Sequence, residues 1–503
     1  MPTDRLFLVC AAVMVSCLLL GGGTRHGFLS DAVIQLLAVP LLLMALRRLA
    51  GLPSLKGTRW ALLLCLAIVL VPSCQLIPLP PHVWTALPHR EAVADAFALL
   101  GRELPWLPVS VSPRATWLSV LSLLPPIAIF LSTLVLGTRE RRALSLILVA
   151  MGIVSVFVGL AQVVEGPTSS LRFYQITNRS EAVGFFANRN HFAASLYACT
   201  AFAAAWTVAL AAPPAPGQTK LDTRWIAPLI ASFTALVILV AAQAITRSRA
   251  GLGLTMVALL GATALAFYGR RQTSGVTPTR LLFAATALAV MFAAQFTLFR
   301  LLERFADDPL KDSRITLARV TADAAQLYMP LGSGIGTFVP VYAMQQRPED
   351  LQIDAYVNRA HNDFLELWLE AGVAGLGLLA LFVVWLVSRS LSLWRRNAPG
   401  REIDLALARA ATIVAALIIV HSLVDYPLRT GAMMAILAFA CGLLIAPSPG
   451  IQDAAFDDRS ERAAAARKGW REPPPVPRPS DASISQHPPK RWGNDIEWPD
   501  EWR

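Results

Sequence analysis

The chain has 503 residues, of which 55% are hydrophobic and only 15% are charged. An average soluble domain carries about 25% charged residues, so this composition excludes a water-soluble globular protein and indicates a polytopic membrane protein. The basic residues behind the net charge of +11 are spread along the chain, which excludes a nucleic-acid-binding face.

Mostly apolar segments follow one another along the chain. About 18 apolar residues are enough for a helix that crosses a bilayer. We therefore predict an all-α membrane protein with about twelve transmembrane helices. In chain order these are Leu6–Gly21, Leu29–Leu46, Trp60–Leu79, Thr116–Leu136, Ala143–Val164, Phe192–Ala211, Ile226–Ile245, Leu252–Tyr268, Leu281–Phe299, Val373–Leu393, Leu405–Leu423 and Ala432–Ile445.

The distribution of Lys and Arg between the predicted loops indicates the orientation. Cytoplasmic loops of membrane proteins carry an excess of these residues. If the N-terminus lies in the cytoplasm, the density of Lys and Arg on the inner loops is more than twice that on the outer segments. We therefore predict an N-in, C-in topology.

Three segments lie outside the predicted spans. The outer loop Pro80–Ala115 contains a predicted interfacial helix at Glu91–Leu100. The outer segment 300–372 is long enough to suggest a function, and it contains a predicted helix at Ile315–Leu327, a tight Gly-rich turn at 332–336 and a helix from Asn362 onward. The chain thus divides into a membrane domain, 1–446, and a Pro-rich tail, 447–503, with the composition of a disordered cytoplasmic segment.

Arginines are concentrated on the predicted outer side, where few are expected. Such residues suit phosphate groups, because a planar guanidinium donates two parallel charge-assisted hydrogen bonds. They indicate an anionic ligand; the alternative is pairing with nearby aspartates or lipid headgroups. The residues concerned are Arg189, Arg247, Arg249, Arg314 and Arg319.

The segment from Arg359 to Gly372 contains the best candidate for a general base. His361 lies just before a predicted span, and a neutral imidazole accepts a proton from a hydroxyl near neutral pH. Asn362 or Asp363 is placed to cap the following helix. Glu366 and Glu370 form the polar side of that helix. The alternative is that His361 is an ordinary surface histidine.

Five motifs in series resemble the O-antigen ligase and O-antigen polymerase superfamily. The resemblance covers roughly residues 115–446, and the motifs keep their order with twelve spans and a long late outer loop. They are Gly184–Asn190, Ser248–Gly251, Arg314 followed by Gly334–Phe338, Ala360–Asp363 and His421–Leu428.

This resemblance implies a GT-C-like glycosyltransferase of the bacterial inner membrane, with its active site on the periplasmic side. The donor would be a glycan on undecaprenyl pyrophosphate, and the acceptor a hydroxyl of lipid A core, of another glycan or of a protein. No metal and no cofactor are expected. By similarity, Arg249 and Arg314 would bind the pyrophosphate and His361 would be the base, with Arg189 as a further pyrophosphate ligand and Asp425 in support.

Some alternatives stay open at this level. The motifs do not separate a ligase from a polymerase or a protein O-oligosaccharyltransferase, although a polymerase is slightly favoured. A flippase or another transporter is the alternative outside the enzyme class, but the spans contain few ionisable groups other than Arg409, His421 and the nearby Asp425. A non-catalytic scaffold is a third. The tail is a candidate binding segment for a cytoplasmic or chain-length-control partner.

Overall fold

Helices make up nearly all the regular structure of this chain. The computed structural model describes residues 4–25, 27–54, 57–211, 226–268, 310–347, 357–396 and 403–447. Within these ranges, eight helices are long and apolar enough to cross a membrane, and three apolar helices are shorter. The one sheet described is an antiparallel pair, β1 (Pro78–Leu79) with β2 (Leu107–Pro108). The predicted all-α polytopic membrane fold is therefore confirmed.

Eleven of the twelve predicted spans coincide with described helices. The remaining predicted span, Leu281–Phe299, lies outside the described residues, as does nearly all of the predicted tail. Helices α6 and α7 together form one span. The helices that coincide with predicted spans are α1 (Arg5–Leu20), α2 (Leu29–Ala50), α3 (Arg59–Cys74), α6 (Pro113–Ser122), α7 (Leu124–Val135), α8 (Thr138–Glu165), α9 (Arg189–Ala211), α10 (Ile226–Thr246), α11 (Arg249–Tyr268), α15 (Asp363–Arg395), α16 (Ile403–His421) and α17 (Gly431–Leu443). Of these, α1, α3 and α17 are the three shorter apolar helices.

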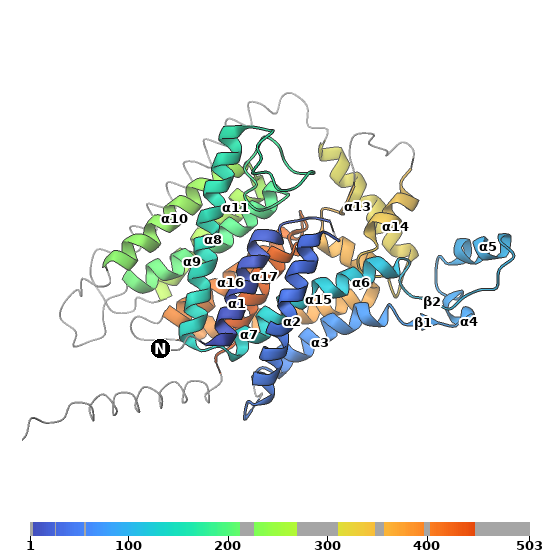
Figure 1. Ribbon diagram of the computed structural model, residues 1–503, viewed down its shortest axis with the longest axis horizontal. Helices are drawn as coiled ribbons and strands as arrows, with labels where there is room; N and C mark the ends of the chain where they lie inside the picture. The colour runs from blue at the N-terminus through green and yellow to red at the C-terminus, as the bar shows by residue number, and fades with distance from the viewer. Residues whose placement is uncertain are drawn as a thin grey trace, which may run out of the picture. The chain divides into compact units, whose positions relative to one another are not determined.

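Helix α9 is the buried centre of one group of helices. It packs against α8, α10, α11 and α16, and α8 to α11 lie together in green in Figure 1. Small residues allow the close approach: a Cβ on Gly251 of α11 would lie 2.3 Å from the Cβ of Ala193 on α9. Close helix contacts through small residues are typical of membrane proteins. Helix α17 packs in turn against α1, α7 and α16.

Helix ends that the sequence assigns to the outer side are hydrogen-bonded to one another. The Ala432 amide at the start of α17 donates to Gly21 at the end of α1 (3.0 Å), and the Asp363 amide at the start of α15 donates to Ser422 after α16 (3.0 Å). These ends therefore lie on one side of the bundle. The assignment of that side to the periplasm, and thus the N-in, C-in topology, stays a prediction.

A second small core lies beyond the outer end of α15, where α13 (Leu310–Leu327) and α14 (Phe338–Gln345) pack against this helix (Figure 1). The two other short helices, α4 (Pro81–Trp84) and α5 (Glu91–Leu99), contribute no residue to this core. Buried side chains such as Leu317, Tyr328 and Phe338 form this core. Helices α5 and α13 confirm the helices predicted at Glu91–Leu100 and Ile315–Leu327.

The Gly-rich turn attaches this outer core to α15. Gly332, Gly334 and Gly336 all have positive φ angles. The amides of Ser333 and Gly334 donate to the carbonyls of Leu369 and Glu370, each at 2.9 Å. The predicted tight turn is confirmed.

A break at Gly372 divides α15 into an outer turn region and a long span. Gly372 has φ 53° and ψ −140°, and a Cβ there would lie 2.1 Å from the Pro330 carbonyl oxygen. The span predicted from hydropathy begins at Val373, directly after this break. The chain therefore changes direction where the membrane-spanning part begins.

We expect Gly372→Ala to destabilise the protein. A non-glycine residue with this backbone conformation costs about 1–3 kcal/mol, and the close carbonyl adds to the cost. The measurement is thermal unfolding of the purified, detergent-solubilised protein. Gly377→Ala on the same helix is the control, because a Cβ there meets nothing within 4 Å. Equal unfolding temperatures for the two variants would contradict the prediction.

Candidate active site

His361 lies at the junction between the outer segment and α15. Its φ angle is 54°, in a region that residues other than glycine rarely adopt. Asn362 is the N-cap of α15, and its side chain accepts hydrogen bonds from the amides of Phe364 and Leu365. The predicted cap is therefore confirmed for Asn362. The His361 side chain is 28% exposed, so its ring remains accessible to a substrate.

Asp425 is the carboxylate next to His361. The His361 Nδ1 lies 3.3 Å from the Asp425 Oδ1, and the Asp425 side chain is only 1% exposed. Burial alone would raise the pKa of Asp425, but the adjacent His361, with the charges of His191 and His421, holds this pKa below its usual range. An ionised Asp425 favours the tautomer with a proton on Nδ1, which leaves Nε2 of His361 to accept a proton.

Tyr426 lies between two imidazole rings. Its ring packs edge-to-face against His361 and against His191, with 4.8 Å between ring centroids in both pairs. The Asn188 amide donates to the Tyr426 hydroxyl at 3.3 Å. His191 is fully buried, and neither of its ring nitrogens has a hydrogen-bond partner among the described residues. The sequence had not singled out His191 or Tyr426 as site residues.

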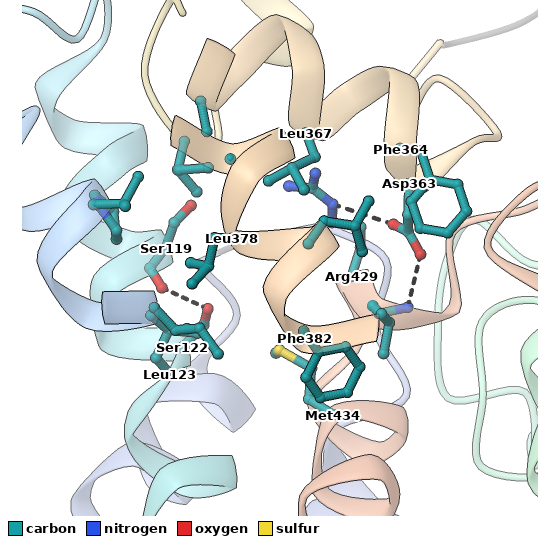
Figure 2. A pocket seen from close by; sticks show the side chains of 18 of the residues that line it. Ser119, Ser122, Leu123, Asp363, Phe364, Leu367, Leu378, Phe382, Arg429 and Met434 are labelled. Carbon is teal, nitrogen blue, oxygen red and sulfur yellow. Dashed lines mark hydrogen bonds and ion pairs between the residues drawn. The ribbon is translucent and has the colours of Figure 1, made fainter. Parts of the chain in front are cut away.

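A buried network of ion pairs lies beside the histidine. The Arg429 guanidinium lies 2.8 Å from Glu370 and 3.3 Å from Asp363, and Arg359 lies 2.8 Å from Glu366. Figure 2 shows Arg429 directed at Asp363. Burial alone would lower the pKa of Arg429, but the three carboxylates raise it above its usual value. The two glutamates are fully buried in ion pairs, rather than forming a solvated polar face.

Neither Arg359 nor Arg429 had been predicted as a site residue. Asp363, Glu366 and Glu370 are spaced to lie on one face of α15, and so many buried carboxylates in an apolar helix require cations close by. This requirement is the sequence signal from which an ion-pair network could have been predicted. It does not identify which arginines along the chain pair with the carboxylates.

The predicted pyrophosphate ligands occupy three different elements. Arg249 is the first residue of α11, and the Ser248 hydroxyl before it accepts a hydrogen bond from the Gly251 amide at 3.1 Å. Arg314 belongs to α13. Both Arg249 and Arg314 are exposed.

Arg189 differs from the other two predicted ligands. It is the first residue of α9, is partly buried and forms an ion pair with Glu181. Its backbone amide donates to the Asn178 side chain at 2.9 Å. A protein carboxylate thus already occupies the position that an anionic ligand would take, which makes Arg189 the weaker candidate.

Residues 234–393 match a family model described as O-antigen ligase. The match covers less than half of the chain, and it makes this part of the chain similar to O-antigen ligases. This match supports the superfamily assignment made from the motifs, and with it a role in O-antigen or polysaccharide assembly at a membrane. No curated protein sequence matches the chain.

The matched range covers part of the site. The matched range contains Arg249, Arg314 and His361, together with the cap Asn362 and the buried Asp363. Arg189 and Asp425 lie outside it. The structure nevertheless places Asp425 next to His361, so the site extends beyond the matched range.

Proposed function

We propose that the protein transfers a glycan from undecaprenyl pyrophosphate to an acceptor hydroxyl at the periplasmic face of the inner membrane. The observation that carries this proposal is the pairing of His361 with the buried Asp425 in a chain whose residues 234–393 are similar to O-antigen ligases. A partly exposed imidazole held by a buried carboxylate is suited to remove a proton from a hydroxyl.

In this reaction Nε2 of His361 accepts the proton of the acceptor hydroxyl. The acceptor oxygen then forms a bond to the anomeric carbon of the donor sugar, and the bond from that carbon to the phosphate oxygen breaks. The electron pair of the broken bond leaves with undecaprenyl pyrophosphate. Direct attack of this kind inverts the configuration at the anomeric carbon, and a retained linkage in the product would contradict it.

The arginines stabilise the charge that develops on the leaving group. Arg249 and Arg314 would each donate charge-assisted hydrogen bonds to the pyrophosphate, and Arg189 would add a weaker interaction because Glu181 already binds it. Asn362 and Asp363 support the start of α15 and thus the position of His361. The mechanism uses neither a metal ion nor an organic cofactor, which stays a prediction.

We expect Arg249→Ala and Arg314→Ala each to reduce glycan transfer about 100-fold, the order of loss that follows removal of one charge-stabilising donor. Arg102→Ala, at an exposed arginine of the loop Pro80–Ala115, is the control and should retain activity. The variants would complement a deletion strain, with long-chain polysaccharide measured in whole cells and transfer measured with purified protein.

The same strain distinguishes the acceptor classes. Polymer that stays on the undecaprenyl carrier would indicate a ligase, and single repeat units on lipid A would indicate a polymerase. Normal complementation by both arginine variants would refute the proposed pyrophosphate site. Accumulation of lipid-linked glycan on the cytoplasmic side would instead indicate a flippase.

A further inference from the structure

Buried polar atoms without a partner are concentrated next to the His361–Asp425 pair. In the part of the chain that the structure describes, nine buried side-chain nitrogen or oxygen atoms have no hydrogen-bond partner. Four of the nine are both ring nitrogens of His191, Nε2 of His421 and Oδ2 of Asp425. Each of these three residues is at most 1% exposed. Buried polar groups in proteins are hydrogen-bonded with few exceptions, so this concentration indicates a polar site that the mechanism above does not yet use.

The two histidines reach this site from different helices. His191 lies in the first turn of α9, and its ring contacts Tyr426, which also contacts the ring of His361. His421 is the last residue of α16, and its carbonyl accepts a hydrogen bond from the Asp425 amide at 3.0 Å. Burial raises the pKa of Asp425, but His361 and both other imidazoles lower it, which places all three rings near the carboxylate. The packing of α9 against α16 therefore holds both histidines beside Asp425.

The two oxygens of Asp425 have different surroundings. Oδ1 lies 3.3 Å from Nδ1 of His361 and accepts a hydrogen bond from the Tyr426 amide at 3.0 Å. Oδ2 has no partner among the described residues. The torsion that orients a carboxylate is broad, so contacts to one oxygen alone fix it poorly. The direction of Oδ1 towards His361 thus depends on what binds Oδ2.

The free ring nitrogens supply the groups that a water molecule needs to bridge to Oδ2. Nδ1 of His421 lies 3.3 Å from the hydroxyl of the buried Tyr197, which leaves Nε2 for another partner. A neutral imidazole has one donor and one acceptor nitrogen. A buried water typically makes about three hydrogen bonds to polar groups that would otherwise be unpaired. His191, His421 and Asp425 offer groups of this number and kind.

We propose that His191 and His421 are positioning residues of the transfer reaction, which hold the second oxygen of Asp425 through a buried water. The imidazole N–H groups donate to the water, and the water donates to Oδ2. Oδ1 then stays directed at Nδ1 of His361, and Nε2 of that ring is free to accept the proton of the acceptor hydroxyl. This inference rests on the proposed function, because Asp425 affects transfer only through His361.

The test begins with His191→Phe in the full-length protein, which keeps a ring against Tyr426 but removes both nitrogens. We expect kcat for glycan transfer to fall about fivefold at an unchanged KM for the donor, the loss that follows removal of one neutral hydrogen bond. His191→Gln keeps a donor and an acceptor and should restore most of the lost rate. Phe192→Leu, an apolar change at the next buried residue of α9, is the matched control and should leave kcat unchanged.

A double variant shows whether the histidine acts through the carboxylate. In the Asp425→Asn protein, the added His191→Phe change should lower kcat by less than about twofold, because residues that act through one shared group are not additive. His421→Phe should behave as His191→Phe does, and it provides the same test from α16 if the first variant does not fold. If neither variant folds, a high-resolution cryo-EM map of the wild-type protein decides: density for a water beside Oδ2 would support the proposal, and its absence would overturn it.

Two kinetic results would also overturn the proposal. They are a wild-type kcat in the His191→Phe protein, and an equal fall of kcat in the wild-type and Asp425→Asn backgrounds. The His361→Ala protein separates this inference from the proposed function. Wild-type transfer by His361→Ala would refute the proposed function, whereas loss of transfer in His361→Ala together with full activity in His191→Phe and His421→Phe would refute the positioning role alone.

Discussion

We expect the His361→Ala protein to lose glycan transfer by about 1,000-fold while it keeps its fold. General base catalysis contributes about 10²–10⁴-fold to reactions of this kind, and among the described histidines His361 combines partial exposure with a buried carboxylate partner. The measurement is the rate of transfer by purified protein from an undecaprenyl-pyrophosphate-linked glycan. His82→Ala, at an exposed histidine of the outer loop, is the matched control.

Asp425→Asn tests the role of the carboxylate separately. The substitution keeps the size of the side chain but removes the charge that favours a proton on Nδ1 of His361. We expect the maximal rate to fall about tenfold or more with little change in binding of the donor, because the base would be held less often in its active tautomer. Wild-type transfer by His361→Ala would refute general base catalysis, whereas wild-type transfer by Asp425→Asn alone would refute only the positioning role.

The helices of this protein could be predicted from its sequence because a bilayer imposes a local rule. Each span must satisfy its backbone hydrogen bonds internally and present apolar side chains, so hydropathy alone locates it. Hydropathy predicts a span that begins at Val373, and the structure breaks α15 at the preceding residue, Gly372. The sequence around this boundary was therefore enough to locate it. The cap at Asn362 follows from equally local chemistry.

The contacts within the site could not be predicted in the same way. Asp425 lies more than 60 residues from His361 along the chain, and Arg429 reaches Asp363 across a similar separation. His191 meets Tyr426 only because α9 packs against η3 (Pro427–Arg429) and α16. Motif order indicated that these segments act together. Which side chains touch depends on helix packing, which has no local sequence signal.

The second large effect concerns Arg429. We expect Arg429→Met to lower the free energy of unfolding by about 3–5 kcal/mol, the usual cost of leaving a buried charge without its partner. The variant would leave Asp363, Glu366 and Glu370 with Arg359 as the remaining guanidinium among the contacts described. Thermal unfolding in detergent would measure the loss. Arg102→Met, at an exposed arginine of the outer loop, is the control.

A second substitution separates charge from packing. In the double variant Arg429→Met, Glu370→Gln, one negative charge is removed together with the positive one, so part of the lost stability should return. If the double variant is as unstable as Arg429→Met, the loss is one of packing rather than charge. If stability returns but transfer does not, the contact between Arg429 and Asp363 is needed to position His361, because Asp363 begins the helix that follows this histidine. The ion pairs would then support the catalytic geometry as well as the fold.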